Sequence, residues 1–159
     1  MVVSEVVYRC ATIDDLDGIL DLWLESVEYH EVLDSRMALN KEAIENVRTF
    51  YSNKYFKDDS ILEIASVDGR VVGVCGAFIQ ETPPIHFERE RGFIDIAFVR
   101  EKYRHHGIGT VLIERVLKWL KSKDLVKIRL TVASRNPTGV SFWKKMGFDD
   151  MMQIMEIKI

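Results

Sequence analysis

A turn rich in glycine and basic residues is the part of this sequence best suited to bind an anion. It follows an apolar run at residues 93–99, which is typical of a buried strand, and it leads into an amphipathic helix. The first N–H groups of a helix lack partners within the helix and carry partial positive charge, so they attract phosphate. The residues expected to form this phosphate site are Arg104, His105, His106, Gly107, Ile108, Gly109 and Thr110.

One carboxylate, Asp95, interrupts the apolar strand before the turn. Its neighbours Ile94 and Ile96 are apolar, and desolvation by such neighbours raises the pKa of a carboxyl group toward the range useful to a general base. Two interpretations of Asp95 therefore stay open. It is either a catalytic base or a structural aspartate paired with Arg91 or Arg129.

Length and composition are those of one globular domain. The chain has 159 residues, of which 47% are hydrophobic and 30% charged, and we expect a single domain over residues 1–159. The net charge of −3 argues against nucleic acid as a partner, and the apolar runs are too short to span a membrane. Cys10 and Cys75 lie far apart without metal-ligand spacing. Together with an N-terminus unlike a secretory signal, they predict reduced thiols and a cytoplasmic location.

Hydrophobic periodicity predicts a mixed sheet with helices on both faces. Asp68-Gly69 predicts a tight hairpin turn, while Gly73 and Gly76 predict a bulge or a close backbone approach. The central strands form an antiparallel meander, and a helical crossover makes a later strand parallel. The predicted strands are 6–10, 61–67, 70–79, 93–99, 126–133 and 154–159, and the predicted helices are 16 to about 30, 40 to about 51, 108 to about 120 and 136–147.

Two motifs resemble the GNAT superfamily of N-acetyltransferases. The first is the Arg-x-x-Gly-x-Gly turn that begins at Arg104. The second is Asn136 followed by residues 142–148, Phe-Trp-Lys-Lys-Met-Gly-Phe, which is similar to the family's Asn…Phe-Tyr-x-Lys-x-Gly-Phe. The close match covers roughly residues 92–148, and the order of elements agrees over the whole chain. A Walker A motif would need Gly-Lys-Ser/Thr, and a dinucleotide fingerprint would need a third glycine.

The resemblance implies the acyl-CoA N-acyltransferase fold, an α/β (α+β) arrangement whose mostly antiparallel sheet has a β-bulge and a splay after the fourth strand. It implies acetyl-CoA as cosubstrate, with the pyrophosphate in the turn and the pantetheine arm paired to the backbone near Phe98 and Val99. One N–H there would stabilise the thioester oxygen as charge develops on it. Asn136 would bind the cofactor and cap its helix. Asp95 stands where many family members place a glutamate base.

Trp143 departs from the family pattern. The family commonly has a tyrosine there, which acts as general acid near the CoA sulfur, and an indole N–H cannot donate a proton at neutral pH. A thiol pKa near ~8.5 lets a thiolate leave fairly well unaided. Tyr103 is one candidate substitute, and Trp143 itself either flanks the pantetheine arm or fills the core. No metal site is expected, because the adjacent side chains of His105 and His106 diverge.

The sequence therefore predicts a transferase that moves an acetyl group from acetyl-CoA directly to a primary amine of a small molecule or peptide. A catalytically weak acyl-CoA-binding regulatory module and an N-terminal peptide or protein acetyltransferase remain alternatives. The unidentified amine acceptor is expected between the first two helices and residues 80–91, where Glu25, Glu28 and Tyr29 supply acids and a ring. In this family an antiparallel C-terminal strand often forms a dimer edge, so a homodimer is also expected.

Overall fold

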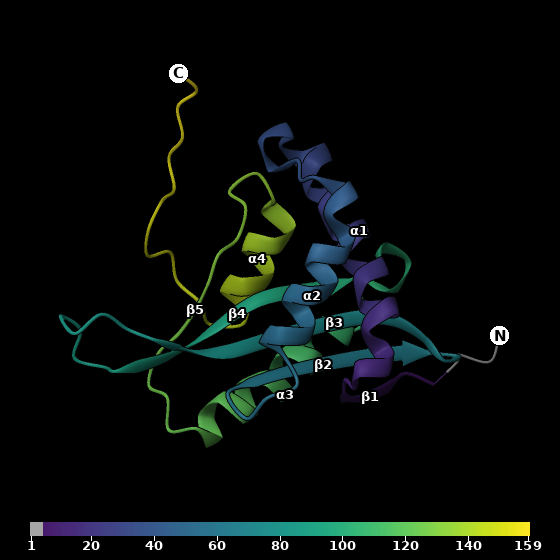
Figure 1. Cartoon of the computed structure of the whole chain (residues 1–159), viewed down its shortest axis with the longest axis horizontal. Helices are drawn as coiled ribbons and strands as arrows, with labels where there is room; N and C mark the ends of the chain where they lie inside the picture. The colour runs from purple at the N-terminus through teal and green to yellow at the C-terminus, as the bar shows by residue number, and fades with distance from the viewer. Residues whose placement is uncertain (1–4) are drawn as a thin grey trace.

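The computed structural model describes residues 5–159 and builds a five-stranded mixed sheet with helices on both faces (Figure 1). The sheet order is β1-β2-β3-β4-β5. The first four strands pair antiparallel, and β5 runs parallel to β4. The predicted fold class is confirmed. The strands are β1 (Val7–Cys10), β2 (Ser60–Val67), β3 (Arg70–Glu81), β4 (Glu90–Val99) and β5 (Ile128–Leu130), and the α-helices are α1 (Leu16–Leu33), α2 (Ile44–Lys54), α3 (Ile108–Ser122) and α4 (Pro137–Lys145).

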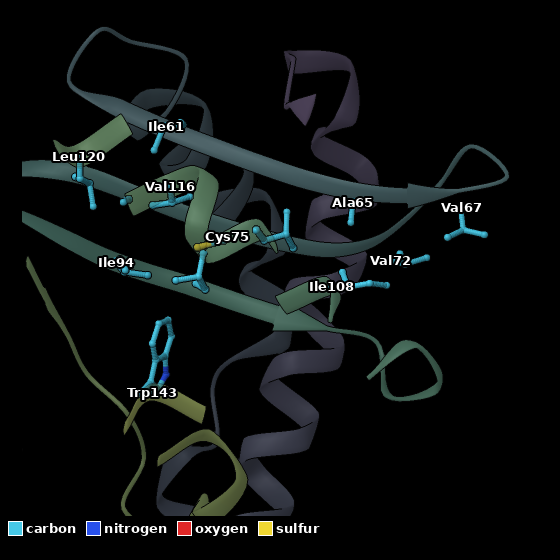
Figure 2. Packing of buried hydrophobic residues seen from close by; sticks show 13 residues of the cluster. Ile61, Ala65, Val67, Val72, Cys75, Ile94, Ile108, Val116, Leu120 and Trp143 are labelled. Atoms are coloured by element: carbon cyan, nitrogen blue, oxygen red, sulfur yellow. The ribbon is translucent and has the colours of Figure 1, made fainter. Parts of the chain in front are cut away.

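Each face of the sheet carries its own hydrophobic core. On one face, α3 buries the stripe predicted from its 3.6-residue spacing, and Figure 2 shows this cluster together with Trp143 of α4. On the other face, α1 and α2 pack against the opposite side chains of β2, β3 and β4. The buried α3 residues are Ile108, Leu112, Ile113, Val116 and Leu120. The sheet is therefore covered on both sides, and a ligand can reach its backbone where the edge of a strand is unpaired.

Local signals mark the starts of two helical regions and the turn of the hairpin. The backbone N–H of Thr12 donates to the Asp15 carboxylate at 2.8 Å and forms a capping box before α1. The Asn40 side chain accepts from the Glu42 N–H at 3.0 Å at the start of the second helical region. Asp68 has φ 50° between β2 and β3, in the left-handed region that a tight hairpin turn requires.

β4 carries a bulge at Asp95 and separates from β5 beyond Ile94. Gly76 of β3 lies opposite Ile96, whereas Ala77 lies opposite Ile94, so Asp95 is the extra residue of the β4 strand. Within residues 5–159, β5 pairs with Gly92, Phe93 and Ile94 of β4. The β5-facing edge of β4 is consequently open from residue 95 to residue 99. Both the predicted bulge and the predicted splay are confirmed.

Two predicted strands differ from the structure. The strand predicted over 126–133 is shortened to Ile128–Leu130, because β4 and β5 diverge and later residues have no neighbouring strand to pair with. The strand predicted over 154–159 is wrong: residues 148–159 contain no assigned helix or strand, and they extend away from the body (Figure 1). Ile154 and Ile157 are 86% and 84% exposed. An alternating apolar segment becomes a strand only when another strand pairs with it.

None of the helices within residues 5–159 is long and apolar enough to cross a membrane.

Candidate active site

The glycine turn forms an open cradle at the start of α3. Gly107 is the N-cap residue, with φ 79° in the left-handed region, and His105 has φ 63°. The Val111 N–H donates to the Gly107 carbonyl at 3.1 Å. The N–H groups of Ile108 and Gly109 therefore precede the first intrahelical bond and face outward from the helix end. Such an array of backbone donors beside a positive helix terminus suits a phosphate.

The surroundings of Gly109 fit a ligand that approaches the backbone closely. A Cβ at this position would meet Phe142 at 3.6 Å and Val99 at 3.8 Å, which are ordinary van der Waals distances. Packing therefore does not require a glycine there, although a glycine within a helix costs about 1 kcal/mol relative to alanine. A phosphate lying against the N–H groups gives a physical reason for the missing side chain. The cradle thus has room for a phosphate group at the start of α3.

Arg104 ties this turn to the end of β4. Its Nε donates to the Val99 carbonyl at 2.8 Å. Its guanidinium carbon lies 4.6 Å from the ring centroid of Tyr29 and 5.1 Å from that of Phe98. The turn is further ordered by His106, whose Nδ1 lies 2.7 Å from the Arg104 carbonyl oxygen. Arg104 therefore brings its positive charge to the splay, while both histidines remain exposed.

The hydrogen-bonding pattern of β4 decides which backbone groups face the open edge. The Arg100 N–H donates to the Val72 carbonyl at 2.9 Å, toward β3. Because the direction alternates along an antiparallel pair, the backbone groups of Phe98 also face β3, and those of Val99 face the open edge. The bond from Arg104 to the Val99 carbonyl agrees with this direction. Of the two predicted residues, Val99 offers the available N–H.

The Asp95 carboxylate accepts a hydrogen bond from the Tyr55 hydroxyl. Tyr55 follows α2, is fully buried, and stacks on Tyr51 with ring centroids 5.6 Å apart. The bulge directs Asp95 to the same face of the sheet as Ile96, and this places it against α2. Neither of the two arginines considered from the sequence is its hydrogen-bond partner among the described residues; Arg91 donates to a glutamine side chain instead.

Desolvation by the surrounding protein raises the pKa of the Asp95 carboxyl above its ordinary value. The hydrogen bond from Tyr55 and the charge of Lys54 act in the opposite direction, and desolvation is the larger effect. Burial and the nearby carboxylate raise the pKa of Tyr55, so this phenol stays protonated and keeps donating to Asp95. The predicted direction of the pKa shift is confirmed, although one side of Asp95 remains open to solvent.

The two predicted residues of α4 have different surroundings. The Asn136 Oδ1 accepts from the Gly139 N–H at 3.0 Å, which confirms the cap, and also from the Tyr29 hydroxyl at 3.3 Å. Trp143 is 9% exposed and belongs to the α3 core cluster, where Figure 2 shows its ring directed toward the sheet. Its ring centroid lies 5.3 Å from that of Phe148. Of the two locations considered for Trp143, the structure places it in the core.

Three functional contacts were not predicted from the sequence. They are the Tyr55–Asp95 hydrogen bond, the approach of Tyr29 to the splay, and the ion pair between Glu25 of α1 and buried Arg100. These partners are 40 to 107 residues apart for the two hydrogen bonds. No local motif marks such pairs, and only packing of α1 and α2 on the sheet brings them to β4.

Comparison with known proteins supports the same family. The sequence model of the acetyltransferase (GNAT) family matches residues 22–148. An uncharacterised N-acetyltransferase from Methanocaldococcus jannaschii is 26% identical over 142 residues; the match covers 89% of this chain but 60% of that protein. A thialysine N-epsilon-acetyltransferase from Bos taurus is 25% identical, with 93% and 86% of the two chains covered.

A solved structure shares the fold at low sequence identity. The crystal structure of a predicted acetyltransferase from Clostridium acetobutylicum, determined with acetyl-CoA, has a TM-score of 0.77 and 20% identity, with 97% of this chain and 96% of that chain covered. At this identity the likeness concerns the fold alone. The family match spans the bulged β4, the glycine cradle and α4. The chain belongs to the acetyltransferase (GNAT) family.

Proposed function

We propose that this protein transfers the acetyl group of acetyl-CoA directly to a primary amine of a small molecule or peptide. The observation that carries the proposal is the joint placement of three features on β4 and the turn that follows it. Asp95 lies at the bulge, Val99 presents its backbone at the open edge, and the phosphate cradle begins a few residues later. A base, an oxyanion donor and an anion site are what this transfer requires.

Each of the proposed groups has a separate role in the reaction. Asp95 accepts the proton that the ammonium form of the acceptor must lose, directly or through a water molecule. The amine nitrogen then forms a bond to the thioester carbon, and the Val99 N–H stabilises the charge that grows on the carbonyl oxygen. The carbonyl then re-forms as the carbon–sulfur bond breaks, the nitrogen releases its second proton to solvent, and CoA leaves with the electron pair on sulfur. Tyr55 holds Asp95 in place by its hydrogen bond.

The charges around α1 support an amine as acceptor. Glu28 and Glu31 lie beside Lys41, with carboxylate–ammonium distances of 3.8 and 3.0 Å, and Glu25 contacts Arg100. These carboxylates therefore already bind the cationic groups of Lys41 and Arg100. A cationic amine would compete with those two groups for the same carboxylates. The thialysine acetyltransferase of Bos taurus carries the name of such an amine. The size and identity of the acceptor depend on α1, α2 and residues 82–89.

The test combines cofactor binding with an amine panel. We expect acetyl-CoA to bind by calorimetry and amines to accelerate CoA thiol release over the rate with Asp95→Asn. Tight binding without amine-dependent release would favour the acyl-CoA-binding module instead. Mass spectrometry of peptides with a free N-terminus or a free lysine distinguishes the N-terminal acetyltransferase, because the acetylated position differs.

We also propose that the protein is cytoplasmic. We further propose that two copies of it assemble through the C-terminal segment, residues 151–159. Its apolar side chains are exposed, including Met152, Met155 and Ile159, and exposed apolar segments of this size are commonly covered by a partner. Light scattering should give the mass of a dimer for the full chain and of a monomer after removal of residues 151–159. A monomeric full chain would refute the assembly.

A further inference from the structure

Tyr29 of α1 lies among the residues that the sequence assigns to cofactor binding. Its hydroxyl donates to Asn136 Oδ1 at 3.3 Å, and its ring lies edge-on to Phe98 with centroids 6.3 Å apart. The guanidinium of Arg104 lies over the same ring at 4.6 Å. Phe98 of β4, Arg104 of the turn and Asn136 before α4 are all predicted to bind the cofactor. All three therefore contact one phenol, which comes from a helix on the other side of the sheet from α4.

The end of α1 is held against the segment that precedes α4, so Tyr29 is anchored there. Asp34, directly after α1, lies 3.6 Å from the Arg135 guanidinium, and its side chain is almost fully buried. This contact joins the residue that follows α1 to the residue that precedes Asn136. Together the two contacts bridge the divergence between β4 and β5. Tyr29 thus lies where the α1 side of the sheet, on which the acceptor is expected, meets the open edge of β4.

The proposed transfer lacks a proton donor for the departing sulfur. Trp143, at the position of the family's tyrosine, is held in the α3 core by neighbouring aromatic rings. Tyr103 packs against the same core cluster, and its ring lies 4.9 Å from the Lys102 ammonium. Tyr29 is the phenol that contacts Phe98 and Asn136, at the splay itself.

We infer that Tyr29 is a catalytic residue that donates its phenolic proton to the CoA sulfur. The inference rests on the proposed function and names a further group in that same site. As the carbon–sulfur bond breaks and the electron pair stays on sulfur, the Tyr29 hydroxyl turns from Asn136 to the sulfur and gives up its proton. The phenolate is then reprotonated from solvent. The Asn136 oxygen keeps its bond from the Gly139 N–H throughout.

Tyr29→Phe is the central variant, because it removes the hydroxyl and keeps the ring beneath Arg104. Initial rates of CoA release with acetyl-CoA and an accepted amine give kcat and KM over a range of pH, and calorimetry gives the acetyl-CoA Kd. We expect kcat to fall about 10- to 100-fold, at the low end of general acid catalysis because a thiolate is a good leaving group. The Kd should change less than threefold, so that the loss falls on kcat and not on cofactor binding.

Two tyrosine variants serve as controls. Tyr8→Phe removes another half-buried phenol at β1, on the far edge of the sheet, and should leave kcat unchanged. Tyr103→Phe tests the other candidate acid. A loss of kcat in Tyr103→Phe with none in Tyr29→Phe would overturn the inference, and so would a Tyr29→Phe defect confined to Kd or KM.

A measurement without amine separates this inference from the proposed function. A hydrogen bond from Tyr29 favours the charged sulfur, so the apparent pKa of bound CoA, read from thiolate absorbance, should be lower in wild type than in Tyr29→Phe. Equal values would overturn the inference even if acetyl transfer is confirmed. Failure of wild type to acetylate any amine would refute the proposed function, while a difference in the bound thiol would still support the placement of Tyr29.

Discussion

Replacing Gly109 with alanine should separate cofactor binding from folding more cleanly than any change at Gly107. Gly107 has φ 79°, so an L side chain there is strained by about 1–2 kcal/mol although space is open. Gly109 lies in the first turn of α3, and an added Cβ meets Phe142 at 3.6 Å without a clash. Gly109→Ala should therefore raise the free energy of unfolding by about 0.5–1 kcal/mol.

We expect the same methyl group to crowd a phosphate that contacts the helix N–H groups. A hydrogen bond to a charged group contributes about 1.5–3 kcal/mol, so displacement of one should weaken acetyl-CoA binding about 10- to 100-fold. Calorimetry with acetyl-CoA and urea unfolding measure the two effects on one protein preparation. We expect Gly109→Ala to be more stable and to bind more weakly, whereas Gly107→Ala loses both stability and affinity.

A Gly109→Ala protein that is stabilised and binds acetyl-CoA within twofold of wild type would refute the assignment of the cradle. Destabilised Gly109→Ala would instead refute the packing argument, because it would mean that the fold itself requires glycine. Gly107→Val is unsuitable for this test, since a β-branched residue is strongly disfavoured at the left-handed φ of Gly107.

Three further predictions concern charged groups. Asp95→Asn should abolish amine-dependent turnover. It should not lower the melting temperature near neutral pH, because desolvation raises the pKa of this carboxyl and so disfavours its ionised form in the fold. In wild type, kcat/KM should fall as pH decreases through that raised pKa. Arg115→Met should lower the free energy of unfolding, measured in urea, by about 2–4 kcal/mol. It leaves the Glu63 carboxylate, 4% exposed, without the guanidinium that lies 2.7 Å away. The double variant that also carries Glu63→Gln should recover most of the loss. The guanidinium beside Asp15 lowers the pKa of that carboxyl to about 2, so its contribution to stability is present above the ordinary value of 3.8 and is lost as pH falls toward 2. Asp15→Asn should therefore cost about 1–2 kcal/mol near neutral pH and much less near pH 2, and an equal loss at both pH values would contradict the ion pair.

The elements that a strong local sequence pattern marks were predictable. The stripe of α3 follows from its helical spacing, the hairpin between β2 and β3 from Asp68-Gly69, and the cap of α4 from Asn136. Weak or context-dependent segments were not. β5 is short because β4 diverges from it, and residues 154–159 remain unpaired because an apolar alternation specifies a strand only where an edge receives it.

The glycine cradle, the bulged strand and the carboxylate at Asp95 follow from local sequence, because glycine conformations, helix termini and apolar periodicity act over a few neighbouring residues. The partners of those groups depend on how the helices pack on the sheet. Tyr55 reaches Asp95 and Tyr29 reaches Asn136 across 40 and 107 residues. Such contacts depend on which face of the sheet each helix covers and on where β4 and β5 separate. The surroundings that raise the pKa of Asp95 and hold Trp143 in the core are likewise consequences of packing, and no local pattern encodes them.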